Sequence, residues 1–293
     1  MQQHNLSKAI DYLGGINGNR IRRTVAFKEF LSLLAHQPDK TLRNVFQLFY
    51  TMVTSHISHD GEACQESQEA HDLLSYDCSP LLIEGSDYPF FADRLFANRL
   101  VNVAEALKRS AQQNKIYIFK GPPGSGKSTF LNNLLRKFEE FTGTEQGLTY
   151  RTLWRLDPKQ LQPDIDLGGA EPSEEPVEVP CPCYDHPILV IPKSYRGGFF
   201  RALFSGSEFE NRLQNDKEFD WVWRNEPCTI CSSLYYALLE RLKDPWRVFE
   251  MVYAQPYQFN RRLGEGIIVF TPVDQPLKHN SIRDPEVHKP IDN

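Results

Sequence analysis

The nine-residue stretch GPPGSGKST, from Gly121 to Thr129, constrains this chain more than any other feature of its sequence. It matches the pattern G-x-x-x-x-G-K-[ST], in which glycines let the backbone curl so that successive N–H groups point at phosphate oxygens. The N-terminus of a following helix adds partial positive charge at the same place. An ordinary glycine turn, the alternative interpretation, leaves the presence of Lys127 and Ser128 unexplained. The sequence therefore predicts a nucleotide-binding loop.

Each position of this loop has an expected role. Lys127 is the candidate catalytic residue, because its ammonium group can reach the β- and γ-phosphates. The Ser128 hydroxyl is placed to ligate Mg²⁺, and Thr129 is placed to contact the α-phosphate. The expected cofactors are thus ATP and Mg²⁺. The predicted nucleotide-binding residues are Gly121, Pro122, Pro123, Gly124, Ser125, Gly126, Lys127, Ser128 and Thr129.

The segments on either side of the loop are typical of one fold. Before it, KIYIFK (115–120) has the pattern of a short buried strand in a parallel sheet. After it, STFLNNLLRKFEEF (128–141) spaces apolar residues at three and four, which predicts a helix with one apolar face. Strand, glycine loop and helix together predict an α/β fold with a P-loop core.

Length and composition narrow the class of protein. The chain has 293 residues, of which 40% are hydrophobic and 24% charged, as in one large or two small globular domains. Its net charge of −5 argues against general electrostatic attraction to nucleic acid. No stretch approaches the length of a membrane span, and the first residues do not resemble a signal peptide. We therefore expect a cytoplasmic protein with reduced cysteines and without a membrane partner.

Apolar spacing also indicates how the chain is organised. It predicts two helices within residues 25–57, separated at Pro38, and another within residues 90–113. The segment GLTYRTLWRL (147–156) predicts a second strand. The expected domains are an N-terminal helical segment (1–85) and a P-loop core (86–293), with an acidic, proline-rich insertion (157–180) and a cysteine-bearing region (181–235).

Four of the cysteines form a second candidate site, for a metal ion. The segment CPC contains Cys181 and Cys183, with His186 close behind, and PCTIC contains Cys228 and Cys231 at C-x-x-C spacing. Two close pairs of soft ligands can close a tetrahedral Zn²⁺ site. Two other interpretations stay open: four buried thiols without a metal, and redox exchange between Cys228 and Cys231.

Four blocks of the sequence resemble the N-terminal part of the PrkA family, AAA-type P-loop proteins described as serine protein kinases. In the family's order, these blocks are VAFKEFLSLLAHQPDKTLRNVFQLFYTMV, DRLFANRLVNVAEALKRSAQQNKIYIFKGPPGSGKSTFLNNLLRKFEEF, CPCYDHPILVIP, and CTICSSLYYALLERLKDPWRVFEMVYAQPYQFNRRLGEGIIVFTPVD. The resemblance implies an AAA-type core and ATP hydrolysis or phosphoryl transfer to a protein. It also implies a protein substrate or partner chain and an oligomer with nucleotide sites between subunits.

The same resemblance bears on the cysteines. Cys181, Cys228 and Cys231 match positions that the family often fills with cysteine. A family histidine corresponds to Tyr184 here, and a family methionine corresponds to Cys183. If a metal binds, the resemblance implies that Cys183 or His186 takes the place of that histidine.

A second departure from the family concerns the acidic residue that normally holds Mg²⁺. The best candidate for this residue is Asp274, at the end of the segment IIVFTPVD (267–274). Pro272 lies two residues before it, and proline does not suit the end of a buried strand. No sensor residue or arginine finger can be assigned, so we expect an incomplete core.

The expected function is a PrkA-like ATPase or serine protein kinase. The alternative is the ATP-binding half of a split or regulatory assembly without its own turnover.

Other nucleotide-binding classes lack their signatures. No N-K-x-D follows the loop, as a GTPase requires, and LGGAE at Leu167 is not the signature of an ABC ATPase. A small-molecule kinase stays open, because its lids and acceptor sites leave little trace in a sequence.

Overall fold

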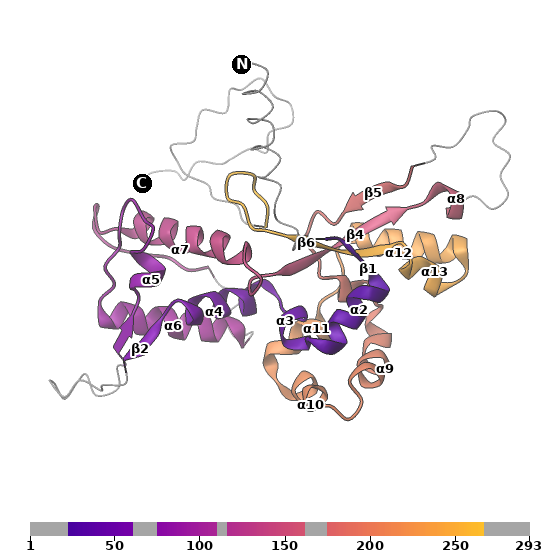
Figure 1. Cartoon of the computed structure of the whole chain (residues 1–293), viewed down its shortest axis with the longest axis horizontal. Coiled ribbons are helices and arrows are strands. Elements are labelled where there is room, and N and C mark those ends of the chain that lie inside the picture. The colour runs from indigo at the N-terminus through magenta and orange to yellow at the C-terminus, as the bar shows by residue number, and fades with distance from the viewer. Residues whose placement is uncertain (1–22, 61–74, 110–115, 162–174, 267–293) are drawn as a thin grey trace, which may run out of the picture.

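The computed structural model of the chain describes residues 23–60, 75–109, 116–161 and 175–266 (Figure 1). Helices dominate, and none of those described is both long and apolar enough to span a lipid bilayer. The helices are α2 (Phe27–His36), α3 (Pro38–Thr41), α4 (Val45–Ser55), α5 (Ser79–Leu82), α6 (Arg94–Lys108), α7 (Lys127–Thr142), α8 (Pro158–Leu161), α9 (Lys193–Phe204), α10 (Glu208–Asn215), α11 (Asp220–Arg224), α12 (Thr229–Leu242) and α13 (Pro245–Phe249). The 3-10 turns are η1 (Pro187–Val190) and η2 (Lys217–Phe219), and the strands are β1 (Val25–Ala26), β2 (Ser58–Asp60), β3 (Ser75–Asp77), β4 (Thr149–Leu156), β5 (Val177–Pro180) and β6 (Val252–Tyr257).

Local sequence signals explain where several helices begin. α4 starts with a capping box, in which Asn44 accepts the N–H of Gln47 and the Gln47 side chain accepts the N–H of Asn44. Asp93 caps α6 by accepting the N–H of Phe96. Helices α2, α4, α6 and α7 and strand β4 confirm the elements that apolar spacing predicts there.

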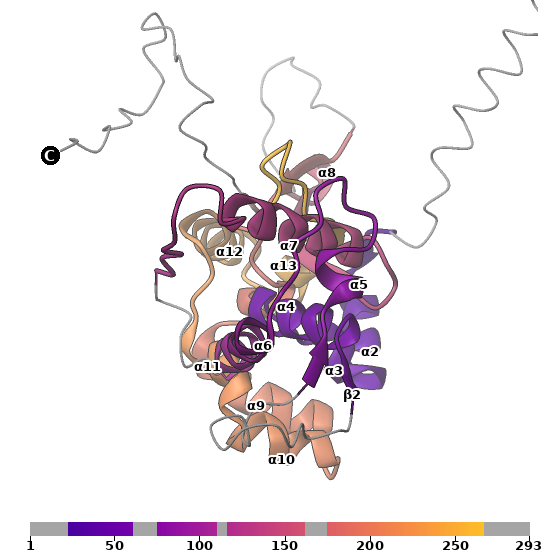
Figure 2. The ribbon, with the colours of Figure 1, turned by 90° about the vertical axis from the view of Figure 1, so that its left-hand side faces the viewer.

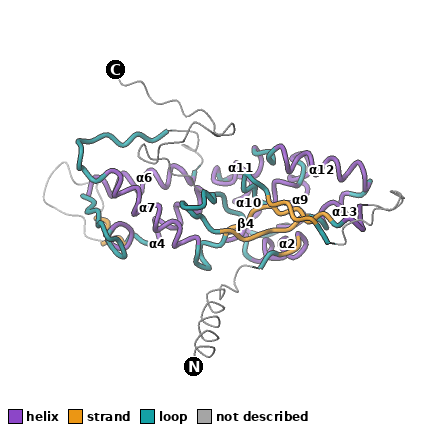
Figure 3. Tube along the Cα trace, turned by 90° about the horizontal axis from the view of Figure 1, so that it is seen from above, coloured by secondary structure: helices purple, strands orange, loops and turns teal. Residues whose placement is uncertain are grey.

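The larger of the two sheets has four strands. Its strand order is β1-β6-β4-β5, and each neighbouring pair is antiparallel. β4 and β6 pair along most of their length, from Thr149 opposite Tyr257 to Trp154 opposite Val252. β2 and β3 form a separate two-stranded sheet. Figure 3 shows β4 running from the group of helices α4, α6 and α7 toward the group α9–α13.

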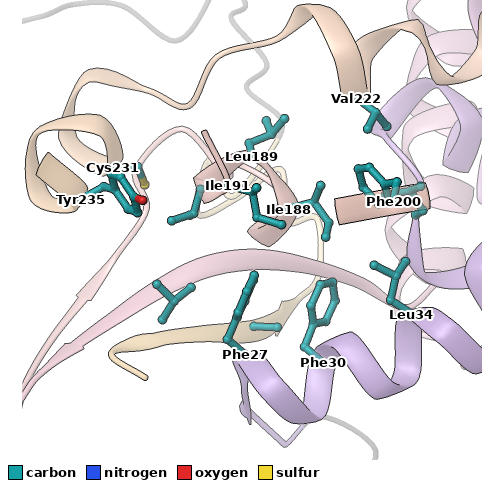
Figure 4. Packing of buried hydrophobic residues seen from close by; sticks show 14 of the residues in the cluster. Phe27, Phe30, Leu34, Ile188, Leu189, Ile191, Phe200, Val222, Cys231 and Tyr235 are labelled. Atoms are coloured by element: carbon teal, nitrogen blue, oxygen red, sulfur yellow. The ribbon is translucent and has the colours of Figure 1, made fainter. Parts of the chain in front are cut away.

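The first hydrophobic core includes buried residues of strands β1, β4 and β6. Phe27, Phe30 and Leu34 of α2 meet Ile188 of η1 and Phe200 of α9, all of them buried (Figure 4). The core therefore joins residues 25–42 to residues 154–254, on both sides of the expected domain boundary at residue 85.

The second hydrophobic core lies among α4, α5, α6 and α7, which Figure 2 shows together. The apolar face of α7 supplies Phe130, Leu134 and Phe138 to it. Met52 of α4 and Phe259, which follows β6, complete its centre. α7 is thus packed on other helices.

The described residues do not contain the parallel-sheet core that the sequence predicts for a P-loop protein. Residues 116–120 form no strand, and the side chains of Ile116 and Ile118 are 90% and 75% exposed. All described strand pairs are antiparallel. The strand prediction at residues 115–120 was wrong over 116–120, because a β-branched and aromatic run does not reveal whether a partner strand lies alongside. The broader assignment, a mixed α/β chain, is confirmed.

Candidate functional site

The predicted nucleotide loop is a compact turn that leads into α7. Gly124 and Gly126 have φ values of +79° and +78°, in the left-handed region that other residues rarely adopt. A Cβ atom on Gly126 would lie 3.0 Å from Cδ2 of Phe90, and one on Gly121 would lie 2.8 Å from Oγ of Ser125. Backbone conformation therefore favours glycine at Gly124 and Gly126, and Gly126 also lies in close contact with the Phe90 ring.

The base of the loop rests on aromatic rings. The Phe90 ring, beneath Gly126, packs 5.5 Å from the ring of Phe130 in the first turn of α7. Phe119, which precedes the loop, also packs 5.5 Å from Phe130. These contacts fix both ends of the loop against the helix without a sheet.

Lys127 folds back over the loop. Its Nζ donates to the carbonyl oxygens of Gly121 and Pro122, at 2.9 and 2.8 Å, and to Oγ of Ser125 at 3.1 Å. Among the described residues it forms no ion pair, so these neutral oxygens are its partners. A phosphate oxygen would be a stronger partner, because it would add the attraction between opposite charges to the hydrogen bond.

The start of α7 is open to an anion. Gly126 occupies the N-cap position and provides no side-chain hydrogen bond, and the first turn contains no acidic residue. The first N–H groups of a helix have no partner within it, so they can donate to a phosphate. Ser128 is exposed and Thr129 is half-buried at this end, while Pro122 and Pro123 lie at the surface of the loop.

Of the acids that could hold Mg²⁺, Asp274 and Asp157, only Asp157 can be placed relative to this loop. Asp274 is outside the described residues. Asp157 follows β4 where α8 begins, at the opposite end of the molecule from the start of α7 (Figure 1).

The second candidate site is a cluster of three cysteines and one aspartate. Sγ of Cys181, Cys228 and Cys231 and a carboxylate oxygen of Asp185 all lie within 4.8 Å of one another, an arrangement that could hold a metal ion. Sγ of Cys181 is 3.6 Å from Sγ of Cys228. Cys181 and Cys231 are buried, and Cys228 and Asp185 are half-buried.

A tight turn brings Asp185 back toward Cys181. The N–H of Tyr184 donates to the carbonyl of Cys181, and Tyr184 has a φ of +57°. Thr152 of β4 holds both ends of the turn, because it accepts the N–H of Cys181 and donates its own N–H and hydroxyl to the carbonyl of Asp185. We call residues 181–185 the cysteine turn.

The other two cysteines lie at the start of α12. Cys228 is the N-cap residue, and its Sγ accepts the N–H of Cys231 at 3.5 Å. The C-x-x-C spacing therefore places both sulfurs at one helix terminus. Figure 4 shows Cys231 beside Tyr235, one helical turn further on.

The structure changes the fourth member of the predicted set. Cys183 is exposed and lies outside the cluster, while Asp185 takes its place. His186 is not in the cluster either: its Nε2–H donates to the carbonyl of Thr41, and its Nδ1 accepts the N–H of Ile188. Burial lowers the pKa of His186 to about 4, which keeps the imidazole neutral. Sequence reasoning missed Asp185, because its place in the cluster depends on the left-handed conformation of Tyr184.

Two thiols of the cluster, those of Cys181 and Cys228, have raised pKa values. A hydrogen bond with Cys231, followed by burial, raises the pKa of the Cys181 thiol. Burial also raises the pKa of the Cys228 thiol, and the nearby Asp185 carboxylate acts in the same direction. A raised pKa makes the Cys228 thiol a poor nucleophile, which argues against redox exchange between Cys228 and Cys231.

A cavity of about 480 Å³ lies between the start of α9 and α12, and its lining includes Pro227 and Ser232, the chain neighbours of Cys228 and Cys231. Its lining includes Lys193, Glu226 and Tyr235. Lys193 forms an ion pair with Glu226 at 3.4 Å and donates to the carbonyl of Arg224. Because its charged groups satisfy one another, this cavity is not a candidate site.

Comparison of the chain with protein-family models, with curated proteins and with solved structures found no match.

Proposed function

We propose that this chain binds ATP with Mg²⁺ at Gly121–Thr129. The observation that carries the proposal is the Lys127 ammonium, whose partners among the described residues are neutral oxygens and which lies over a glycine loop at an uncapped helix start. Such a site favours a phosphate chain through backbone N–H groups, the helix dipole and one fixed cation. ATP is favoured over GTP because the sequence lacks N-K-x-D after the loop.

The proposed use of ATP is hydrolysis or phosphoryl transfer to a protein, as in the PrkA family that the chain resembles. In this chemistry most of the catalysis comes from positioning and from stabilising charge on the transferred group. Lys127 would stabilise the charge on the β- and γ-phosphates, and Ser128 would hold Mg²⁺. We place this activity in the cytoplasm and expect it to act on, or together with, another protein chain.

A second candidate function is ATP binding without turnover, as one part of a regulatory assembly. It is favoured by the antiparallel pairing of all described strands and by the position of Asp157 far from the loop. No described strand thus presents an acid in the usual place beside the Mg²⁺ ligand. A partner chain would then supply that acid.

The two candidates are separated by measuring binding and turnover on the same preparation. Binding of a fluorescent ATP analogue reports the site, and release or transfer of the radioactive γ-phosphate reports chemistry. Turnover that Lys127→Ala abolishes supports the enzyme, whereas binding without turnover supports the second candidate. An analogue that does not bind the wild-type chain contradicts both.

We also infer that the metal of the cysteine cluster is Zn²⁺. Three sulfurs and one carboxylate oxygen form a ligand set that suits this ion better than Mg²⁺ or Ca²⁺, which prefer oxygen ligands alone.

A further inference from the structure

The distances within the cysteine cluster match those of a four-coordinate metal. With Zn–S bonds of about 2.3 Å, tetrahedral geometry places two sulfurs about 3.8 Å apart. The observed distance between Sγ of Cys181 and Sγ of Cys228 is 3.6 Å, and all four ligand atoms lie within 4.8 Å of one another. The same sulfurs are too far apart for a disulfide, whose S–S bond is about 2.0 Å.

Each sulfur also accepts an N–H donor, as metal-bound thiolates do. Sγ of Cys181 accepts the backbone N–H of Asp185 at 3.3 Å, and Sγ of Cys228 accepts that of Cys231. Sγ of Cys231 accepts Nε1–H of the fully buried Trp154 at 3.4 Å. Donors of this kind orient the ligands and stabilise negative charge on sulfur.

The carboxylate of Asp185 is oriented in the same way. Its Oδ2 accepts the backbone N–H of Cys228 at 2.6 Å, so the cysteine turn is already joined to the start of α12. A carboxylate that binds a metal through one oxygen keeps the other for such a hydrogen bond. All four coordination positions are filled by protein atoms, which is the arrangement of a structural site.

We propose that Zn²⁺ bound by Cys181, Asp185, Cys228 and Cys231 is a structural cross-link that fastens the cysteine turn to α12. This inference rests on the assignment of Zn²⁺ to the cluster and is independent of the ATP site. The two segments joined are 43 residues apart along the chain between Asp185 and Cys228. The turn is bound to Thr152 of β4, and α12 packs in the first hydrophobic core. The ion therefore links the central sheet to the helices that cover it.

The test begins with zinc content and thermal melting of the full chain. Protein purified without chelators should contain about one Zn²⁺ per chain, since closed sites bind tightly. Removing the ion with a strong chelator should lower the melting temperature by roughly 5–10 °C, and adding Zn²⁺ should restore it.

Variants then test the ligand set. Cys231→Ser and Asp185→Asn should both reduce the zinc content, and Cys231→Ser should do so more severely. Cys183→Ser is the matched control, because it removes an exposed thiol from the same turn and should keep the full zinc content and melting temperature. Replacement of Zn²⁺ by Co²⁺ gives a second readout: thiolate charge-transfer absorption should appear in the wild type and in Cys183→Ser.

Each contrary result overturns a different part of the inference. Protein purified without chelators that contains no zinc, and that takes up none when Zn²⁺ is added, would contradict the zinc assignment. Zinc that can be removed without a change in melting temperature would contradict the structural role. Loss of zinc in Cys183→Ser would contradict the ligand set. None of these outcomes bears on ATP binding, which is measured separately.

Discussion

Lys127 and Arg196 are both cations whose partners in the described structure are neutral oxygens, but their surroundings differ. The Arg196 side chain is fully buried, and it donates to the carbonyls of Leu189, Ile191, Val222 and Asn225. Burial lowers its pKa, and four directed bonds hold the charge in place. Lys127 is half-buried, but its hydrogen bonds to the loop oxygens are exposed, so a ligand could replace those oxygens. We therefore expect Arg196 to contribute to stability and propose that Lys127 contributes to binding.

Arg196→Met should lower the free energy of unfolding by about 3 kcal/mol or more, because it leaves buried carbonyls without donors. Arg196→Lys, which keeps the charge but not the planar fork, should be less destabilising. Denaturant unfolding measures both. Equal midpoints for the wild type and Arg196→Met would show that these hydrogen bonds contribute nothing net.

Ser128→Ala should remove most of the increase in ATP affinity that Mg²⁺ provides, because the proposed metal ligand is lost. The measurement is the ratio of ATP affinities with Mg²⁺ and with a Mg²⁺ chelator. Ser125→Ala is the control: its hydroxyl bonds to Lys127 in the same loop, and the ratio should stay near the wild-type value. A Ser128→Ala ratio equal to that of the wild type would remove Ser128 from the site.

At the scale of elements, the same substitution should have opposite effects in two places. Gly126→Ala forces a φ of +78° on alanine and pushes its Cβ against Phe90, so it should destabilise the loop by about 1 kcal/mol or more and weaken ATP binding. Gly198→Ala lies within α9, where an added Cβ meets no atom within 4 Å. It should stabilise the protein by about 0.5–1 kcal/mol without affecting ATP. Thermal melting and nucleotide titration of both variants check this contrast.

Elements defined by local signals were predictable from the sequence. Apolar spacing located α2, α4, α6 and α7, and a β-branched and aromatic run located β4. Residues 116–120 have a similar composition but form no strand, because strand formation depends on a partner that lies far away in the sequence.

The cysteine cluster was predictable only in part, for a related reason. C-x-x-C spacing identifies Cys228 and Cys231 as neighbours at a helix terminus. Whether Cys183 or Asp185 joins them depends on the left-handed conformation of Tyr184, which the sequence does not reveal.

At the scale of the whole molecule, β6 extends from the first hydrophobic core, where Val252 and Ala254 lie, to the second, against which Tyr257 packs. The two candidate sites belong to different cores. Phe130 of the loop helix is in the second core, whereas Cys181 and Cys231 are in the first. Zinc removal should therefore lower the melting temperature while leaving ATP affinity within about twofold of the wild-type value, since additivity holds for distant sites. Nucleotide titration before and after chelation and renewed addition of Mg²⁺ tests this independence. A parallel loss of both properties would show that the two cores are coupled.

Isothermal titration calorimetry of the full chain with ATP and Mg²⁺ tests whether Gly121–Thr129 holds the phosphates of ATP. We expect one saturable site whose affinity falls at least tenfold, about 1.4 kcal/mol, in Lys127→Ala. Far-UV circular dichroism of that variant should match the wild type, because the hydrogen bonds that Lys127 makes are exposed to solvent. No heat of binding to the folded wild-type chain, or equal affinity in Lys127→Ala, would show that this loop does not hold the phosphates of ATP.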